Sequence, residues 1–141
     1  YWAAAVALLI GIAAGVALTF HLSPDRQSRL YSSHVHLNVF GWVALTVLGT
    51  EFPLWPMVLH TRVVDGVERA ARRALLLCTA GLALTVAGLL AAARPLTATG
   101  LAVYTAGVCC CLDPFVRTAR QRLPRDLRIR RTPPEAALPG D

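Results

Sequence analysis

Four long apolar runs, separated by short segments that carry arginines, constrain the fold of this chain more than any other feature. The runs cover about residues 2–22, 33–59, 74–92 and 96–115 of 141, and 55% of all residues are hydrophobic. A helix needs about 20 mainly apolar residues to cross the hydrocarbon core of a bilayer. The sequence therefore predicts an all-α fold. We expect residues 1–118 to form a bundle of four transmembrane helices, with the lipid bilayer as their first partner.

The arginines indicate how such a bundle would be oriented. All 14 basic residues are arginines, and the formal net charge is +6. Only Arg26, Arg29 and Arg94 lie in the links after the first and third runs; the others lie in the link after the second run or beyond the fourth. An even number of spans places both termini on the arginine-rich side, which the positive-inside rule makes cytoplasmic. No recognition motif accompanies the charge, so we expect no nucleic-acid partner.

The two ends of the chain suggest a piece of a longer protein. Tyr1 opens directly into an apolar run without a basic region or a clear cleavage site, which favours a membrane anchor over a signal peptide. Residues 119–141 are basic and rich in proline, and we expect them to form a cytoplasmic tail or linker without fixed structure. Other membrane helices or subunits are therefore expected partners.

Local signals divide the first half of the chain further. Ser23-Pro24-Asp25 is expected to break the first helix, with residues 25–32 as a polar link. Pro53 and Pro56 remove backbone donors and are expected to kink the second helix. Gly11 and Gly15 form a G-x-x-x-G pattern, which would let another helix approach the first one closely.

Three of the four histidines fall at one end of the predicted bundle. The topology places His21, His34 and His36 on the outer side and His60 on the cytoplasmic side. His34 and Asn38 share a helix face one turn apart, so Asn38 could orient His34 by a hydrogen bond. His36 lies roughly 200° around the helix from His34, so a rigid helix cannot aim both at one ion.

The residues alone leave the role of these histidines open. Interfacial imidazoles that merely face water and headgroups cost little, and this interpretation weighs as much as ligation of haem or copper. A role in handling protons is a third alternative. Neutral imidazole suits copper, zinc and iron alike, so the residue types do not choose among them.

Glu51 and the cysteines are further polar or reactive groups inside the predicted spans. An ionisable residue within the membrane suggests function, and Glu51 is offset by roughly 60° from His36 on a regular helix, which would let both line a proton path. The alternative is a protonated Glu51 that hydrogen-bonds to a neighbouring helix. Cys78 and Cys109–Cys111 would suit copper(I), but consecutive positions point in different directions, and packing is the favoured interpretation.

One stretch resembles a known family. The string His34-Val35-His36-Leu37-Asn38-Val39-Phe40-Gly41-Trp42-Val43-Ala44-Leu45-Thr46-Val47-Leu48-Gly49-Thr50, followed by Leu54-Trp55-Pro56, is similar to a family of polytopic actinobacterial membrane proteins often labelled copper oxidases. His34-x-x-Leu37-Asn38 also resembles the helix-two haem ligand of haem–copper oxidase subunit one. The resemblance covers about residues 33–62 and implies a bacterial plasma membrane location.

Carried over, the resemblance makes His34 a haem iron ligand and His36 a second ligand or a propionate contact. The oxidase pattern also needs a distant partner histidine and three copper-binding histidines, which the third and fourth runs lack. His21, missing sequence or another subunit would have to supply a second axial ligand. The resemblance thus implies haem or copper in an oxidoreductase-like or electron-transfer setting, and any enzyme activity rests on it alone. The alternative is a non-catalytic membrane scaffold or transport component without metal.

Overall fold

The structure is a computed structural model, and it describes residues 1–60 and 66–120. Its elements are α1 (Trp2–Ala17), α2 (Pro24–His36), the π-helix η1 (Leu37–Ala44), α3 (Leu45–Leu59), α4 (Val67–Leu90) and α5 (Arg94–Arg120). Every regular element in these residues is a helix, which confirms the all-α prediction. The predicted tail, 119–141, lies outside the described residues except for its first two positions.

Three helical runs are long and apolar enough to cross a membrane. They are the continuous run Pro24–Leu59, made of α2, η1 and α3, together with α4 and α5. The predicted first span, 2–22, forms a helix of only 16 residues, or about 24 Å at 1.5 Å per residue. Tight i→i−3 bonds from Thr19 to Val16 and from Phe20 to Ala17 continue it for one further turn. Membrane association thus follows from three helices, while α1 is a shorter apolar helix beside them.

The second run begins nine residues earlier than predicted, because Ser23-Pro24-Asp25 starts a helix and does not break one. Ser23 is the N-cap residue, Pro24 opens the first turn, and Asp25 lies in that turn. Proline suits this position because the first helical N–H has no partner within the helix, and an acidic residue there favours the positive helix end. The expected polar link, 25–32, is therefore helical, and the run reaches 36 residues.

The irregular part of this run is η1, which the sequence did not indicate. The helix continues as α3 through Pro53 and Pro56 to Leu59, whereas Leu37–Ala44 adopts the wider π-helical turn. Segments with i→i+5 hydrogen bonds are rare and are often found at functional sites. Gly41 lies at the middle of η1, where a methyl group would lie 2.5 Å from Cβ of Ala7 and 2.9 Å from Cδ2 of Leu82. A glycine here lets η1 pack between α1 and α4.

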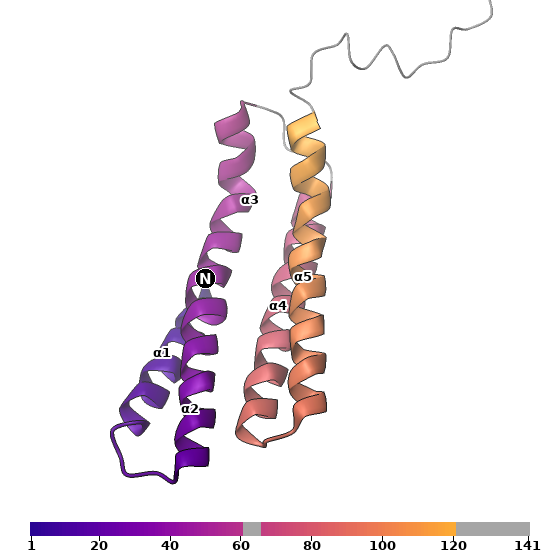
Figure 1. Ribbon diagram of the computed structural model, residues 1–141. Helices are drawn as coiled ribbons and strands as arrows, with labels where there is room; N and C mark the ends of the chain where they lie inside the picture. Colours follow the sequence, from indigo (N-terminus) through magenta and orange to yellow (C-terminus); the bar gives the residue numbers. More distant parts are fainter. Residues whose placement is uncertain (61–65, 121–141) are drawn as a thin grey trace, which may run out of the picture.

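The helices α4 and α5 form an antiparallel hairpin beside α1 and the long run (Figure 1). Their turn is Ala91–Ala93, in which Ala92 has a φ of 56° and Ala93 N–H bonds to the Gly88 carbonyl. This is the usual helix ending in which glycine is preferred at the left-handed position. Arg94 and Pro95 open α5, and α5 passes the expected end of the fourth run, at about residue 115, to reach Arg120.

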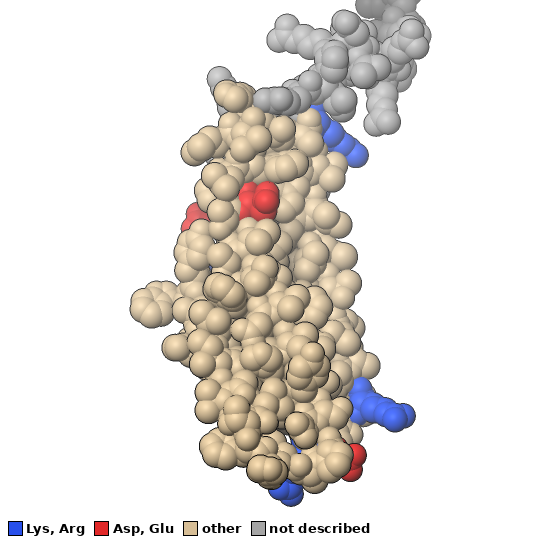
Figure 2. All heavy atoms as spheres, turned by 60° about the vertical axis from the view of Figure 1, so that its left-hand side comes forward, with Lys and Arg blue, Asp and Glu red and all other residues tan. Residues whose placement is uncertain are grey.

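The buried core joins all helical layers. One cluster contains small and apolar residues from α1, η1, α3, α4 and α5 (Ala4, Ala7, Leu37, Leu45, Cys78, Leu82 and Tyr104). A second cluster of Phe52, Ala74 and Cys111 lies where α3 meets the hairpin. Figure 2 shows the basic side chains near the two ends of the body, with a broad surface of other residues between them. Large exposed side chains such as Leu9, Val47 and Leu76 are what lipid contact favours.

Candidate functional site

His34 is fixed against α1 by a hydrogen bond to the backbone. Its Nδ1 lies 2.7 Å from the Gly11 carbonyl oxygen. A carbonyl can only accept, so Nδ1 carries a proton, and in the neutral imidazole Nε2 then keeps its lone pair. No described residue makes a hydrogen bond with Nε2. Histidines that bind metal are commonly oriented in this way, by donating the opposite ring N–H to a backbone carbonyl.

Asn38 supports His34 from one turn further along. Its Nδ2 donates to the His34 carbonyl at 2.8 Å. The same Nδ2 lies 3.4 Å from Nδ1 of His34. Because Nδ1 already donates to Gly11, we interpret the shorter contact as the hydrogen bond and the longer one as packing. The expected pairing of these two residues on one helix face is confirmed, although the amide reaches the backbone of His34 and not its ring.

The two glycines of the G-x-x-x-G pattern provide the space for this pair. A methyl group on Gly11 would lie 2.8 Å from Nδ2 of Asn38, and one on Gly15 would lie 2.9 Å from Cε1 of His34. Both distances are shorter than real contacts of a Cβ atom. The close approach predicted from the pattern is confirmed. We call these four residues (Gly11, Gly15, His34 and Asn38) the histidine clamp.

His36 faces a different neighbour. Its Nδ1 lies 2.8 Å from the Ser32 carbonyl, which again assigns a proton to Nδ1. The His36 ring lies 5.4 Å from the Phe40 ring, and Phe40 lies 5.4 Å from Tyr104 of α5. The inference that His34 and His36 do not address one ion is therefore consistent with the separate partners of the two rings.

Tyr104 is a residue that sequence reasoning missed. It is buried, and its hydroxyl donates to the Phe40 carbonyl at 2.9 Å. Phe40 lies within η1, so the bond ties α5 to the irregular segment next to the histidines. A lone tyrosine in an apolar run is a weak signal. A polar hydroxyl needs a partner when it is buried, and that requirement could have marked Tyr104.

His21 lies in the link between α1 and α2 and is exposed. Within residues 1–60 and 66–120, no three His, Cys, Asp or Glu side chains come close enough to hold a metal ion together. The structure thus brings His34 together with Asn38, and His36 with Phe40, but it does not assemble the three histidines around one point.

Glu51 is half-buried on α3, and its carboxylate makes no hydrogen bond or ion pair with another described residue. The π-helix lies between His36 and Glu51, and its wider turn changes the angle between them. The offset of roughly 60° expected for a regular helix therefore does not apply. The role of Glu51 in a proton path stays a prediction.

The cysteines take different positions along the hairpin. Cys78 and Cys111 are buried, and each thiol is 3.7 Å from a backbone carbonyl, that of Tyr104 and that of Gly107 respectively. Cys109 is exposed and Cys110 is half-buried. The two buried thiols behave as small packing residues, in keeping with the favoured interpretation.

Comparisons of this chain with protein-family models, with curated proteins and with solved structures give no match.

Proposed function

We propose that this chain is an integral protein of a bacterial plasma membrane whose His34 binds haem iron, in an oxidoreductase-like or electron-transfer setting. The observation that carries the proposal is the hydrogen bond from Nδ1 of His34 to the Gly11 carbonyl, because it holds the ring and leaves Nε2 as a donor of electrons to a metal. The resemblance around His34 to the haem ligand of haem–copper oxidase subunit one agrees with this role.

Haem fits the donor set better than a copper site built from this chain. One or two axial imidazoles suffice for haem iron. A copper site held by three histidines would need three rings around one point, whereas His34 and His36 have separate neighbours. When bound, haem would supply one-electron chemistry. His34 would hold the iron, the Gly11 carbonyl would keep the imidazole oriented, and Asn38 would pack beside the ring. His21, or a ligand from another subunit, would complete the coordination.

The proposed topology has four spans with both termini cytoplasmic. One group of arginines lies near the start of α4 and the end of α5 (Arg69, Arg72, Arg73, Arg117 and Arg120). A smaller group lies near the α1–α2 and α4–α5 links (Arg26, Arg29 and Arg94). Those two links lie at the same end of the molecule (Figure 1). The positive-inside rule then makes that end periplasmic. With its extra turn to Phe20, α1 would cross a locally thinned bilayer.

A reporter-fusion map tests this topology. Reporters joined after Leu22 and after Ala93 should both show a periplasmic location, and one joined after Arg120 should show a cytoplasmic location. If the first two reporters fall on opposite sides of the membrane, the four-span arrangement is wrong and the histidine end has no defined side.

A second candidate function is a membrane scaffold or transport component without metal. The same clamp favours it, since interhelical hydrogen bonds and small residues hold membrane helices together without a cofactor. His34→Asn separates the two candidates. An asparagine amide can take the place of Nδ1 and donate to the Gly11 carbonyl, but it has no equivalent of Nε2.

The experiment is the visible absorption spectrum of the full chain, purified from cells that make haem. A Soret band that is lost in His34→Asn, with the same thermal stability as the wild type, supports ligation by His34. His60→Asn serves as the matched control and should keep the band. A wild-type protein that folds but neither carries haem nor takes up added haem would contradict the proposal and favour the scaffold.

A further inference from the structure

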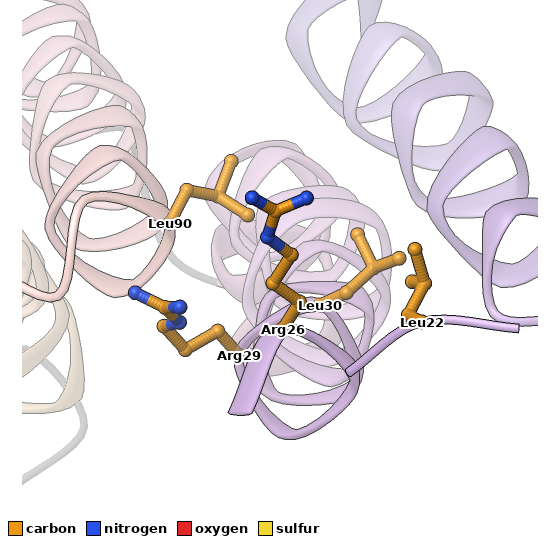
Figure 3. Close-up of a pocket in the computed structure, with 5 residues that line it drawn as sticks. All are labelled: Leu22, Arg26, Arg29, Leu30 and Leu90. Carbon is orange, nitrogen blue, oxygen red and sulfur yellow. The ribbon is translucent and has the colours of Figure 1, made fainter. Parts of the chain in front are cut away.

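A cavity with two arginines opens between the start of α2 and the end of α4. It measures about 450 Å³ and is lined by Leu22, Arg26, Arg29, Leu30 and Leu90. In Figure 3 the two arginine side chains extend from the start of α2, and Leu90 of α4 lies beside them. This place is apart from the histidine clamp, which lies between α2 and α1.

A second cavity adjoins the first through a shared residue. It measures about 400 Å³, and both Arg29 and Arg94 line it. Its remaining walls are small or apolar residues of α4, α5 and the turn between them (Gly88, Leu89, Ala92, Thr97, Ala98 and Leu101). Arg29 therefore lines both cavities, whereas Arg26 lines only the first and Arg94 only the second.

These arginines make no ion pair within the described part of the protein. None of Arg26, Arg29 and Arg94 forms an ion pair with a carboxylate in residues 1–60 or 66–120. Arg29 is half-buried and uses only its Nε, which donates to the Asp25 backbone carbonyl at 3.2 Å. Its two terminal amino groups are left to donate together. A guanidinium group with this geometry suits a phosphate, to which it can donate two parallel hydrogen bonds.

The walls of the cavities continue into an exposed apolar surface. Leu90 is 51% exposed and Leu101 is 42% exposed. A free phosphate ion would make no use of these leucines, whereas the acyl chains of a lipid would cover them. On the cytoplasmic or matrix side of membranes, basic pockets between helices bind lipid headgroups, and the same pairing of guanidinium with phosphate is open to a pocket at this end.

We propose that the arginines at this end bind the phosphate headgroup of an anionic phospholipid, with its acyl chains packed along Leu90 and Leu101. Arg29 holds the phosphate between the two hollows, and Arg26 and Arg94 contact it from either side. The site is independent of haem binding by His34. In the proposed topology it draws its lipid from the outer leaflet.

Native mass spectrometry of the full chain in a non-ionic detergent tests the proposal. The probes are phosphatidylglycerol, phosphatidylcholine with the same acyl chains, and inorganic phosphate. The wild type should bind one phosphatidylglycerol in preference to phosphatidylcholine. The double substitution Arg26→Ala with Arg29→Ala should weaken that first binding event by on the order of tenfold, because each arginine near a membrane surface contributes appreciably to attraction of an anionic lipid.

The matched control is the double substitution Arg72→Ala with Arg73→Ala, which removes the same charge from exposed positions on α4. It should leave the first binding event unchanged, and circular dichroism should show native helix content in both variants. Equal weakening in both variants would show that total charge alone attracts the lipid and would overturn the site. Tight binding of inorganic phosphate that competes with the lipid would show a soluble-anion site. Wild-type preference for phosphatidylcholine, or for neither lipid, would also refute the proposal.

Discussion

The two helix pairs of this protein are held together by glycines in different ways. Between α4 and α5, a methyl group on Gly81 would lie 2.4 Å from the backbone nitrogen of Tyr104, and one on Gly100 would lie 2.4 Å from the backbone nitrogen of Thr85. Between α1 and the continuous α2–η1 run, the atoms that face Gly11 and Gly15 belong to the side chains of Asn38 and His34. The hairpin therefore packs backbone against backbone, whereas the α1–α2 contact is filled by the polar groups of the histidine clamp.

This difference separates a rigid part of the molecule from an adaptable one. Glycines recur seven residues apart on each helix of the hairpin, at 81 and 88 on α4 and at 100 and 107 on α5. They form one continuous stripe along which the two backbones meet. Backbone atoms cannot move aside, whereas a histidine or an asparagine side chain can change its rotamer. The hairpin is thus suited to hold the bundle rigid, whereas the α1–α2 contact can accommodate movement of its side chains.

Gly100→Ala should have the largest effect on stability. Its new methyl group would clash with the backbone of Thr85, which cannot shift without separating the helices. We expect a loss of about 3 kcal/mol, since overpacking a tight contact costs 1–3 kcal/mol and sometimes more. Reversible unfolding in mixed detergent measures it. Gly49→Ala is the control, since its methyl group would lie 3.8 Å from the nearest atom, Cε1 of Tyr1. Equal losses in both variants would contradict the rigid hairpin.

His34→Ala should come next. It removes the hydrogen bond to Gly11 and leaves a space beside Gly15, so we expect a loss of about 1–2 kcal/mol, the usual range for one hydrogen bond with its packing. His34→Asn should recover most of this loss, because its amide can donate to the same carbonyl. The same unfolding assay measures both variants, and an unchanged midpoint in His34→Ala would show that the bond does not hold α1.

Gly15→Ala should cost less than Gly100→Ala, about 1 kcal/mol, because the His34 ring can move by a few tenths of an ångström. The displaced ring would also misplace Nε2, so haem affinity should fall by more than stability does. Haem titration followed by absorption checks the first quantity and unfolding checks the second. A loss as large as that of Gly100→Ala would remove the distinction between the two helix pairs.

Tyr104→Phe should have the smallest effect. It removes only the hydrogen bond to the Phe40 carbonyl, and side-chain hydrogen bonds between membrane helices average about 0.6 kcal/mol. Hydrogen exchange of the η1 amides should nevertheless increase, because this bond ties the irregular segment to the rigid hairpin. Unchanged exchange in η1 would show that the hairpin does not support the segment next to the histidines.

The sequence predicted the helices better than their ends. Apolar runs identified most of the helical residues, because a membrane-crossing helix must be long and apolar, but they missed the polar residues 25–32 of α2. The predicted start of the second run and the predicted end of the fourth run were both wrong. Pro24 starts a helix because the first turn needs no N–H. The helix α5 contains Pro114 and continues to Arg120, and the Thr118 hydroxyl donates to the Pro114 carbonyl.

The histidine clamp was partly predictable and its surroundings were not. One-turn spacing indicated the pairing of His34 with Asn38, and the glycine pattern indicated a close helix contact. The π-helix depends on how Gly41 fits between Ala7 and Leu82, which is a property of the assembled bundle. The angle between His36 and Glu51 could therefore not be calculated from the geometry of a regular helix. The glycine stripe of the hairpin was readable from its spacing of seven and was missed.

The protonation of the His34 ring tests the central claim most directly. Solid-state NMR of the full chain in lipid, with ¹⁵N-labelled histidine and His34→Asn to assign the signal, reports which ring nitrogen carries the proton. We predict a His34 ring with its proton on Nδ1, hydrogen-bonded to the Gly11 carbonyl, and with an unprotonated Nε2. A His34 ring with its proton on Nε2 would contradict the clamp, and with it the geometry on which ligation by His34 depends.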